Sequence, residues 1–252
     1  MLNWNSLSRR DIRLTAFVAL CMPFVWAVSQ AEEIYGQPDA PLVAEVLGTK
    51  IHTSDLDEMQ YVILSKLTDR YATERGIQVK REEIDAYIET IRRFMEKDRK
   101  QSEARREQIA RKLDAKDLPA EERKRLSAER DRLNELLAAQ EEAAGGAAEN
   151  PEEDKTARDR IASSFIRQFK INRALYEQYG GRIAFQQGGP EPLDAYRKFL
   201  KEQEKQGAFK ILKKEFEPKF WRYYVTDSIH SFYPPGSKEE AQAFQTPQWL
   251  SD

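Results

Sequence analysis

The sequence predicts a mostly α-helical fold with one small two-stranded β pairing and a long inserted helical hairpin. Three observations lead to this prediction. Apolar residues recur at three- and four-residue steps over much of the chain after residue 54, as buried helix faces require. One short β-like run stands alone at residues 42–47, and residues 96–142 are densely charged with few apolar side chains. A hydrophobic content of 40% allows a core, but 33% charged residues mean that only part of the chain lies inside it.

Residues 1–31 have the layout of a signal peptide. Three arginines precede an apolar run from Leu14 to Val28, and the small residues Ser29 and Ala31 favour cleavage before Glu32. The run is short for a membrane span, which needs about 20 apolar residues, although an uncleaved anchor stays open as an alternative. The arginine pair also fits a twin-arginine signal, so the export route is left open. We expect a periplasmic or secreted protein with no stable membrane span after cleavage.

The mature chain begins with the β-like run and two helices, which we assign to the first part of a helical domain at residues 32–95. Ser54 is the expected N-cap of the first helix, and Gly76 ends it. A second helix carries a clear apolar stripe that we expect to be buried. Its members are Ile84, Tyr87, Ile88, Ile91, Phe94 and Met95.

A charged arm is expected at residues 96–142. Helices over 81–113 and 119–142 would fold into a hairpin, with Pro119 at the start of the second. The expected inner seam is thin and consists of Ile109, Leu113, Leu126, Leu133 and Leu137. The sequence AAGGAAENPEED follows, and its composition predicts a flexible linker over residues 143–156.

The second part of the helical domain is expected at residues 157–226. A helix ends at Gly180-Gly181, a short extended segment follows at 182–187, and further helices occupy the remainder. The chain from residue 227 to 252 is expected to be loosely ordered, with docking of Phe244 and Trp249 as the less favoured alternative.

Residues 42–95 resemble the N-terminal domain of SurA-like periplasmic chaperones, which are related to parvulin-type foldases. The resemblance lies in the strand LVAEVLG, the helix opening TSDLDEM and above all RGIQVKREEIDAYIETI at residues 75–91. Lys80 departs from the family pattern, because a Ser, Thr or Asp cap usually stands there. Residues 157–224 also look like the later part of such a domain, so residues 96–142 would be an insertion.

The resemblance implies a partner for the first strand. In this family the first strand pairs with a distant segment that ties the two ends of the chain together, and RIAFQQ at residues 182–187 is the expected partner. The alternative is that residues 42–47 extend over the helices without pairing.

No motif for catalysis or for a cofactor stands out in the sequence. The isomerase domain that this family often carries would need about 90 residues after Val225, together with characteristic histidines, and the chain has only His52 and His230. The paired glycines fit neither a dinucleotide fingerprint nor a P-loop. The net charge of the mature chain is slightly negative, which argues against nucleic acid. We therefore expect no enzyme activity, cofactor or metal, with an unrecognised enzyme as a minor alternative.

Aromatic residues are concentrated after residue 160. Most are expected in the core, but those of the last helix spread around more than one face, so some are expected to line a groove. The residues predicted to bind a client polypeptide are Phe165, Phe169, Tyr176, Phe216, Phe220, Trp221 and Tyr224.

The sequence therefore favours a non-catalytic exported chaperone that holds unfolded or extended segments in an aromatic groove. Its partners would be unfolded or partly folded exported proteins. The alternative is a dedicated assembly factor or subunit that docks one specific exported protein, and the long charged arm fits that alternative better.

Overall fold

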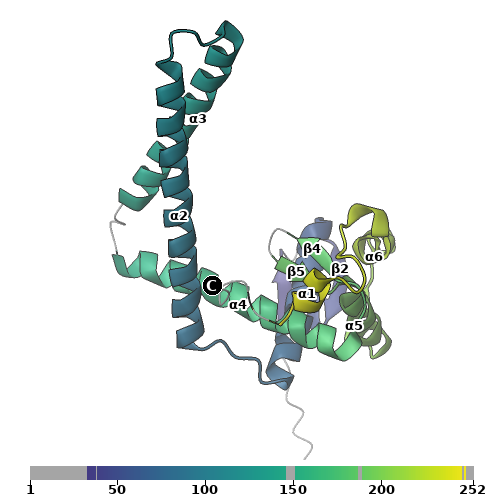
Figure 1. The fold of residues 1–252 in the computed structure, drawn as a ribbon. Helices are drawn as coiled ribbons and strands as arrows, with labels where there is room; N and C mark the ends of the chain where they lie inside the picture. The colour runs from purple at the N-terminus through teal and green to yellow at the C-terminus, as the bar shows by residue number, and fades with distance from the viewer. Residues whose placement is uncertain (1–32, 38, 146–150, 187–188, 246, 248–252) are drawn as a thin grey trace, which may run out of the picture. The chain divides into compact units, whose positions relative to one another are not determined.

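The protein was analysed as a computed structural model that describes residues 33–37, 39–145, 151–186, 189–245 and 247. The expected signal peptide and Trp249 lie outside these residues. Seven α-helices and six short strands make up the described part, so the prediction of a mostly α-helical fold with a small β component is confirmed (Figure 1).

Four strands form one mixed sheet in the order β1-β3-β2-β6. They are β1 (Glu33–Gly36), β2 (Leu42–Val46), β3 (Thr49–His52) and β6 (Phe209–Ile211). β2 and β3 form a hairpin whose two turn residues, Leu47 and Gly48, both have positive φ angles of 51° and 81°. This is the backbone of a type I′ turn, whose twist matches that of the strands it joins.

The first strand of the motif does pair with a distant segment, but the predicted partner is wrong. β2 pairs antiparallel with β6, with Glu45 opposite Lys210. Residues 184–186 form β4 (Ala184–Gln186), which pairs with β5 (Gly189–Glu191) in a separate two-stranded sheet. The physical reason is the turn chemistry after residue 187, which folds β4 back on its immediate neighbour. The alternative of an unpaired segment at residues 42–47 is also excluded.

Helices α1 (Leu56–Glu74), α5 (Leu193–Lys205) and α6 (Glu217–Val225) pack with this sheet around one core. The C-terminal half of α4 (Pro151–Tyr179) completes it. We call this assembly the body. Its largest fully buried side chains include those of Phe199, Phe209, Phe220, Ile51, Met59, Ile63, Leu67, Ile171 and Leu175.

The cap of α1 differs by one residue from the prediction. Asp55, and not Ser54, accepts hydrogen bonds from the backbone N–H groups of Asp57 (2.7 Å) and Glu58 (3.4 Å). Thr53 in turn accepts a bond from the N–H of Asp55 at 3.0 Å. A carboxylate at this position also favours the positive end of the helix dipole.

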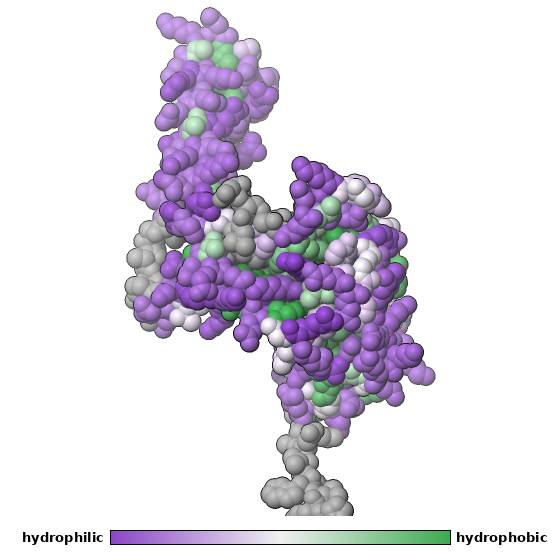
Figure 2. Space-filling view, turned by 60° about the horizontal axis from the view of Figure 1, so that its bottom comes forward, coloured by the Kyte–Doolittle hydropathy of each residue, from purple (hydrophilic) through white to green (hydrophobic). Residues whose placement is uncertain are grey.

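The predicted hairpin is present. It consists of α2 (Arg81–Leu113) and α3 (Ala120–Gly145), which lie side by side (Figure 1). Ile109 and Leu126 are fully buried in the seam, and Arg105 bonds Glu129 across it at 2.8 Å. The remaining predicted seam residues, Leu113, Leu133 and Leu137, are half-buried. The face of the hairpin seen in Figure 2 is mainly hydrophilic, with small hydrophobic patches near its tip.

α2 runs through residue 95 without a break, as the predicted helix over 81–113 requires, so the first part of the domain and the arm share this helix. The predicted linker at 143–156 is shorter than expected, because α3 extends to Gly145 and α4 begins at Pro151, a residue that suits the first turn of a helix.

The segment after residue 226 is more ordered than predicted. It contains a short 3-10 helix, η1 (Asp227–Ile229), and the helix α7 (Lys238–Gln242). Tyr233 donates its N–H to the carbonyl of Ile183 at 3.0 Å, so this segment adds to the β4 edge. Phe244 is 7% exposed and contacts Phe169 and Tyr176 on α4, which is the docking that the sequence favoured less.

Candidate polypeptide-binding surface

The aromatic residues around α6 do not form the predicted groove. Phe216, Phe220 and Tyr224 are at most 5% exposed, so these three predicted binding residues belong to the core. Trp221 is half-buried and packs edge to face against Phe220, with the ring centroids 5.2 Å apart. The groove was expected because the rings of the last helix, from Phe216 to Tyr224, were predicted to spread around more than one helical face. The chain instead forms β6, a turn and the nine-residue helix α6, so most of these rings can point into one core.

The three predicted residues on α4 have different surroundings. Phe169 and Tyr176 are half-buried, because Phe244 packs against both at centroid distances of 5.9 and 5.2 Å. Phe165 is 45% exposed and remains a candidate for binding.

Polar contacts fix the start of α2 on α4. Lys170 donates to the carboxylate of Glu83 at 2.6 Å and to the carbonyl of Gln78 at 2.7 Å. Arg81 bonds Asp159 on the other side of the crossing. Glu83 also accepts the N–H of Lys80 at 2.8 Å, which replaces the missing side-chain cap at that position. These bonds hold the pKa of Glu83 below its ordinary value, although partial burial acts in the opposite direction and is the largest single influence.

An aromatic pair marks the end of the contact between α2 and α4. Tyr87 stacks on Phe165 with ring centroids 5.9 Å apart and an angle of 15° between the ring planes. Because residues four apart are neighbours on a helix, Ile91 lies one turn beyond this pair on the same face of α2, and Ile161 lies one turn before it on α4.

Beyond the aromatic pair, the residues of the apolar stripe on α2 are exposed to solvent. Phe94 is 68% exposed, Met95 54% and Ile91 41%. On α4, Ile161 is 56% exposed. The prediction that the whole stripe is buried is therefore wrong for its last three members. We call the five exposed residues Ile91, Phe94, Met95, Ile161 and Phe165 the α2–α4 apolar surface.

Ion pairs lie to one side of the exposed stripe on α2. Arg92 contacts Glu89 at 2.8 Å and Glu96 at 3.5 Å, and Lys100 contacts Glu96 at 2.8 Å. Hydrogen bonds from these cations lower the pKa of both carboxyl groups, so the groups stay ionised at neutral pH. The apolar strip therefore has charged groups of both signs on one side of it.

A hollow of about 450 Å³ lies between α1, α4, α5 and α6. Its polar groups bond one another: Tyr196 donates to Asn172 at 2.7 Å, Gln168 donates to the Tyr196 hydroxyl at 2.8 Å, and Tyr223 donates to Glu191 at 2.6 Å. Burial raises the pKa of Glu191, against the lowering effects of Tyr223, His230 and Gln186. These bonds satisfy the polar groups of the cluster within the protein.

The described residues contain no group of three or more His, Cys, Asp or Glu side chains arranged to hold a metal ion. Among the described helices, none has both the length and the apolarity needed to cross a bilayer.

Comparisons with known proteins give no relative for this chain: no family model, no curated protein and no solved structure matches it. The function must therefore be argued from the chain's own geometry.

The sequence contained one signal for the α2–α4 apolar surface. The apolar stripe of α2 runs without interruption from Ile84 to Met95, which identifies the helix face on which the exposed residues lie. A stripe that is longer than its partner helix can cover leaves its end exposed.

Proposed function

We propose that this protein is a non-catalytic polypeptide-binding protein of the chaperone type, and that the α2–α4 apolar surface is where a client segment binds. The observation that carries the proposal is the exposure of Ile91, Phe94 and Met95 in a row on one helix face, whose earlier members Ile84, Tyr87 and Ile88 are half-buried. Clustered exposed apolar side chains on a protein surface mark interaction sites more often than isolated ones do.

The chemistry of this surface suits segments that are apolar and variable in sequence. Phe and Met offer a large contact area, and Met adapts its shape to different partners. Burial of apolar surface contributes about 25 cal/mol per Å², so a few client side chains would bind weakly and reversibly. The resemblance to SurA-like chaperones and the signal-like N-terminus favour exported, unfolded or partly folded clients.

A light-scattering experiment tests this function. A chemically denatured outer-membrane β-barrel protein is diluted into buffer with or without the purified protein, and its aggregation is followed. We expect delayed aggregation at several-fold excess of the protein. The double variant Phe94→Gln/Met95→Gln should lose most of this effect, because it removes the apolar side chains while glutamine maintains helix propensity.

Tyr61→Gln is the matched control. Tyr61 is also 68% exposed on a helix, but it lies on α1, outside the proposed surface. Melting temperatures of both variants should stay close to that of the unaltered protein. Full aggregation suppression by the double variant would refute this surface as the binding site, and no suppression by the unaltered protein would refute the chaperone function.

The hairpin favours a second function, docking of one dedicated exported partner. Beyond residue 98 both helices carry mainly charged surface and bury only Ile109 and Leu126 fully, so they contribute little to the body's core. A pull-down with the purified protein separates the two functions. One stoichiometric partner supports dedicated docking, whereas a broad set of unfolded clients supports the chaperone.

A further inference from the structure

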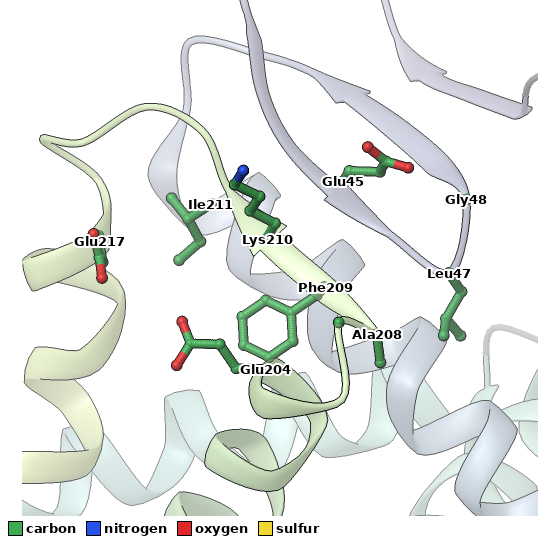
Figure 3. Close-up of a pocket in the computed structure, with 10 residues that line it drawn as sticks. Glu45, Leu47, Gly48, Glu204, Ala208, Phe209, Lys210, Ile211 and Glu217 are labelled. Carbon is green, nitrogen blue, oxygen red and sulfur yellow. The ribbon is translucent and has the colours of Figure 1, made fainter.

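A cavity of about 450 Å³ lies against β6, which is an edge strand of the four-stranded sheet. Figure 3 shows Phe209, Lys210 and Ile211 of β6 at this cavity, with Glu204 from the end of α5 and Glu217 from the start of α6 beside them. The cavity is separate from the α2–α4 apolar surface, so it requires its own explanation.

The hydrogen-bond register shows which backbone groups of β6 face the cavity. Leu47 donates its N–H to the carbonyl of Ala208 at 2.8 Å, and Leu212 donates to the carbonyl of Val43 at 2.8 Å. Because bonding alternates along an antiparallel pair, residues 208, 210 and 212 bond to β2. The N–H and C=O groups of Phe209 and Ile211 therefore point to the outer edge, where the described residues provide no strand to pair with them.

The charge around this edge is mainly negative. Glu45, Glu204 and Glu217 line the cavity, and Lys210 is the basic residue among its lining. Glu204 and Glu217 are close enough to influence each other: burial and then the charge of Glu217 raise the pKa of Glu204. Two neighbouring carboxylates favour an incoming cation, because a positive charge relieves their mutual repulsion.

We propose that the outer edge of β6 is a docking site for an extended polypeptide segment with basic side chains, which adds to the sheet as a further strand. The outward N–H and C=O groups of half-buried Ile211 supply the main-chain hydrogen bonds, because Phe209 is 2% exposed and its backbone is covered. Glu204 and Glu217 select lysine or arginine. Strand addition of this kind combines sequence-independent backbone bonding with side-chain selection. Because β6 has only three residues, the site accepts a short segment.

Fluorescence anisotropy with a labelled peptide of alternating valine and lysine tests this docking site on the full chain. We expect saturable binding, with affinity lowered about tenfold or more when every second peptide amide is N-methylated, because methylation removes the donors that β6 requires. A peptide with glutamate in place of lysine should bind no more tightly than the methylated lysine peptide does. Equal binding by the methylated or the glutamate peptide would overturn the proposal.

Protein variants give an independent test. Ile211→Pro removes an outward N–H without removing a bond to β2, and Ile211→Val is its matched control. Glu204→Gln/Glu217→Gln should weaken binding of the lysine peptide, whereas Glu215→Gln, which pairs with Lys213 outside the cavity, should not. Unchanged binding by both Ile211→Pro and the double glutamine variant would overturn the site.

Two further outcomes distinguish other occupants and the other site. If the free protein sediments as a dimer that Ile211→Pro dissociates, the edge pairs with a second copy and the peptide proposal is wrong. The Phe94→Gln/Met95→Gln variant should bind the lysine peptide normally, because this site does not depend on the α2–α4 apolar surface; loss of binding in that variant would overturn the separate site.

Discussion

At the scale of single residues, Gly181 lies where the segment after α4 closely approaches the start of α5. It follows the end of α4 with φ at +104°, and a Cβ atom there would lie 2.4 Å from the Cβ of Asp194. Asp194 is 8% exposed and accepts the N–H of Arg182 at 3.0 Å, so it cannot move away easily.

We therefore predict that Gly181→Ala lowers the free energy of unfolding by about 3 kcal/mol or more, because backbone strain and a steric clash act together. Gly180→Ala is the control. Gly180 has φ at +58° but open space around it, so its cost should be about 1 kcal/mol. Urea unfolding measures the free energy of unfolding of both variants. Equal losses would show that the contact with Asp194 adds no steric cost.

A second residue, Glu191, predicts how stability depends on pH. Burial raises its pKa in the folded protein, so the fold favours the protonated form. Its contribution to stability is largest below the ordinary glutamate pKa of about 4.3 and is lost as pH rises through the raised folded value.

Glu191→Gln should therefore raise the melting temperature at pH 7, because a neutral amide oxygen still accepts the bond from Tyr223 without the cost of a buried charge. The gain should shrink toward pH 4. Glu202→Gln is the control, since its carboxylate accepts a bond from Tyr179 at 2.6 Å in an exposed position. A gain that does not change with pH would contradict the assigned shift.

At the scale of secondary-structure elements, the hairpin depends on very few apolar contacts. Ile109 of α2 and Leu126 of α3 are its fully buried side chains. Ile109→Ala should speed hydrogen exchange in both hairpin helices beyond residue 98 and leave exchange in α1 unchanged, because local opening needs only the loss of local contacts. Leu136→Ala, at a side chain that is 44% exposed, should change little. Faster exchange in α1 would mean that the hairpin and the body unfold together.

Some elements could be predicted from the sequence better than others, for physical reasons. The bounds of α2 at 81–113 follow from a long periodic stripe and charged ends, which are local signals. β6 has three residues between Gly207 and a turn, too few to show any period, and its neighbours imitate a helical aromatic stripe. The prediction of an aromatic groove was wrong because this strand was not recognised. Phe165, a predicted binding residue, is exposed, whereas Phe94 and Met95 were not predicted as exposed, because periodicity shows which residues share a face but not how far the partner helix reaches.

At the scale of the whole molecule, the pairing of β2 with β6 closes the body. These strands are more than 150 residues apart in the chain, so no local pattern could identify the partner of β2. Residues 182–187 were the extended candidate that the sequence showed, whereas the strand at residues 209–211 was not recognised. The closure also joins α1, which follows the β2–β3 hairpin, to α6, which follows β6.

Phe209 connects this closure to the core, so it tests whether the two ends of the chain are stabilised together. The whole residue is 2% exposed, and its ring centroid lies 5.7 Å from that of Phe220 on α6. Phe209→Ala should cost about 3–5 kcal/mol, as cavity formation at a buried aromatic does. Phe185→Ala, at a ring that is 57% exposed, should cost less than about 1 kcal/mol.

The decisive measurement is which segments exchange their amide hydrogens faster in the Phe209→Ala variant. If β2 and β6 close a single cooperative body, hydrogen exchange should speed up in β2, α1 and α6 to the same extent, because opening one strand releases both ends of the chain. Faster exchange confined to β6 and α6 would show that the N-terminal strands are stable without this pairing, and the body would then consist of two independently stabilised halves.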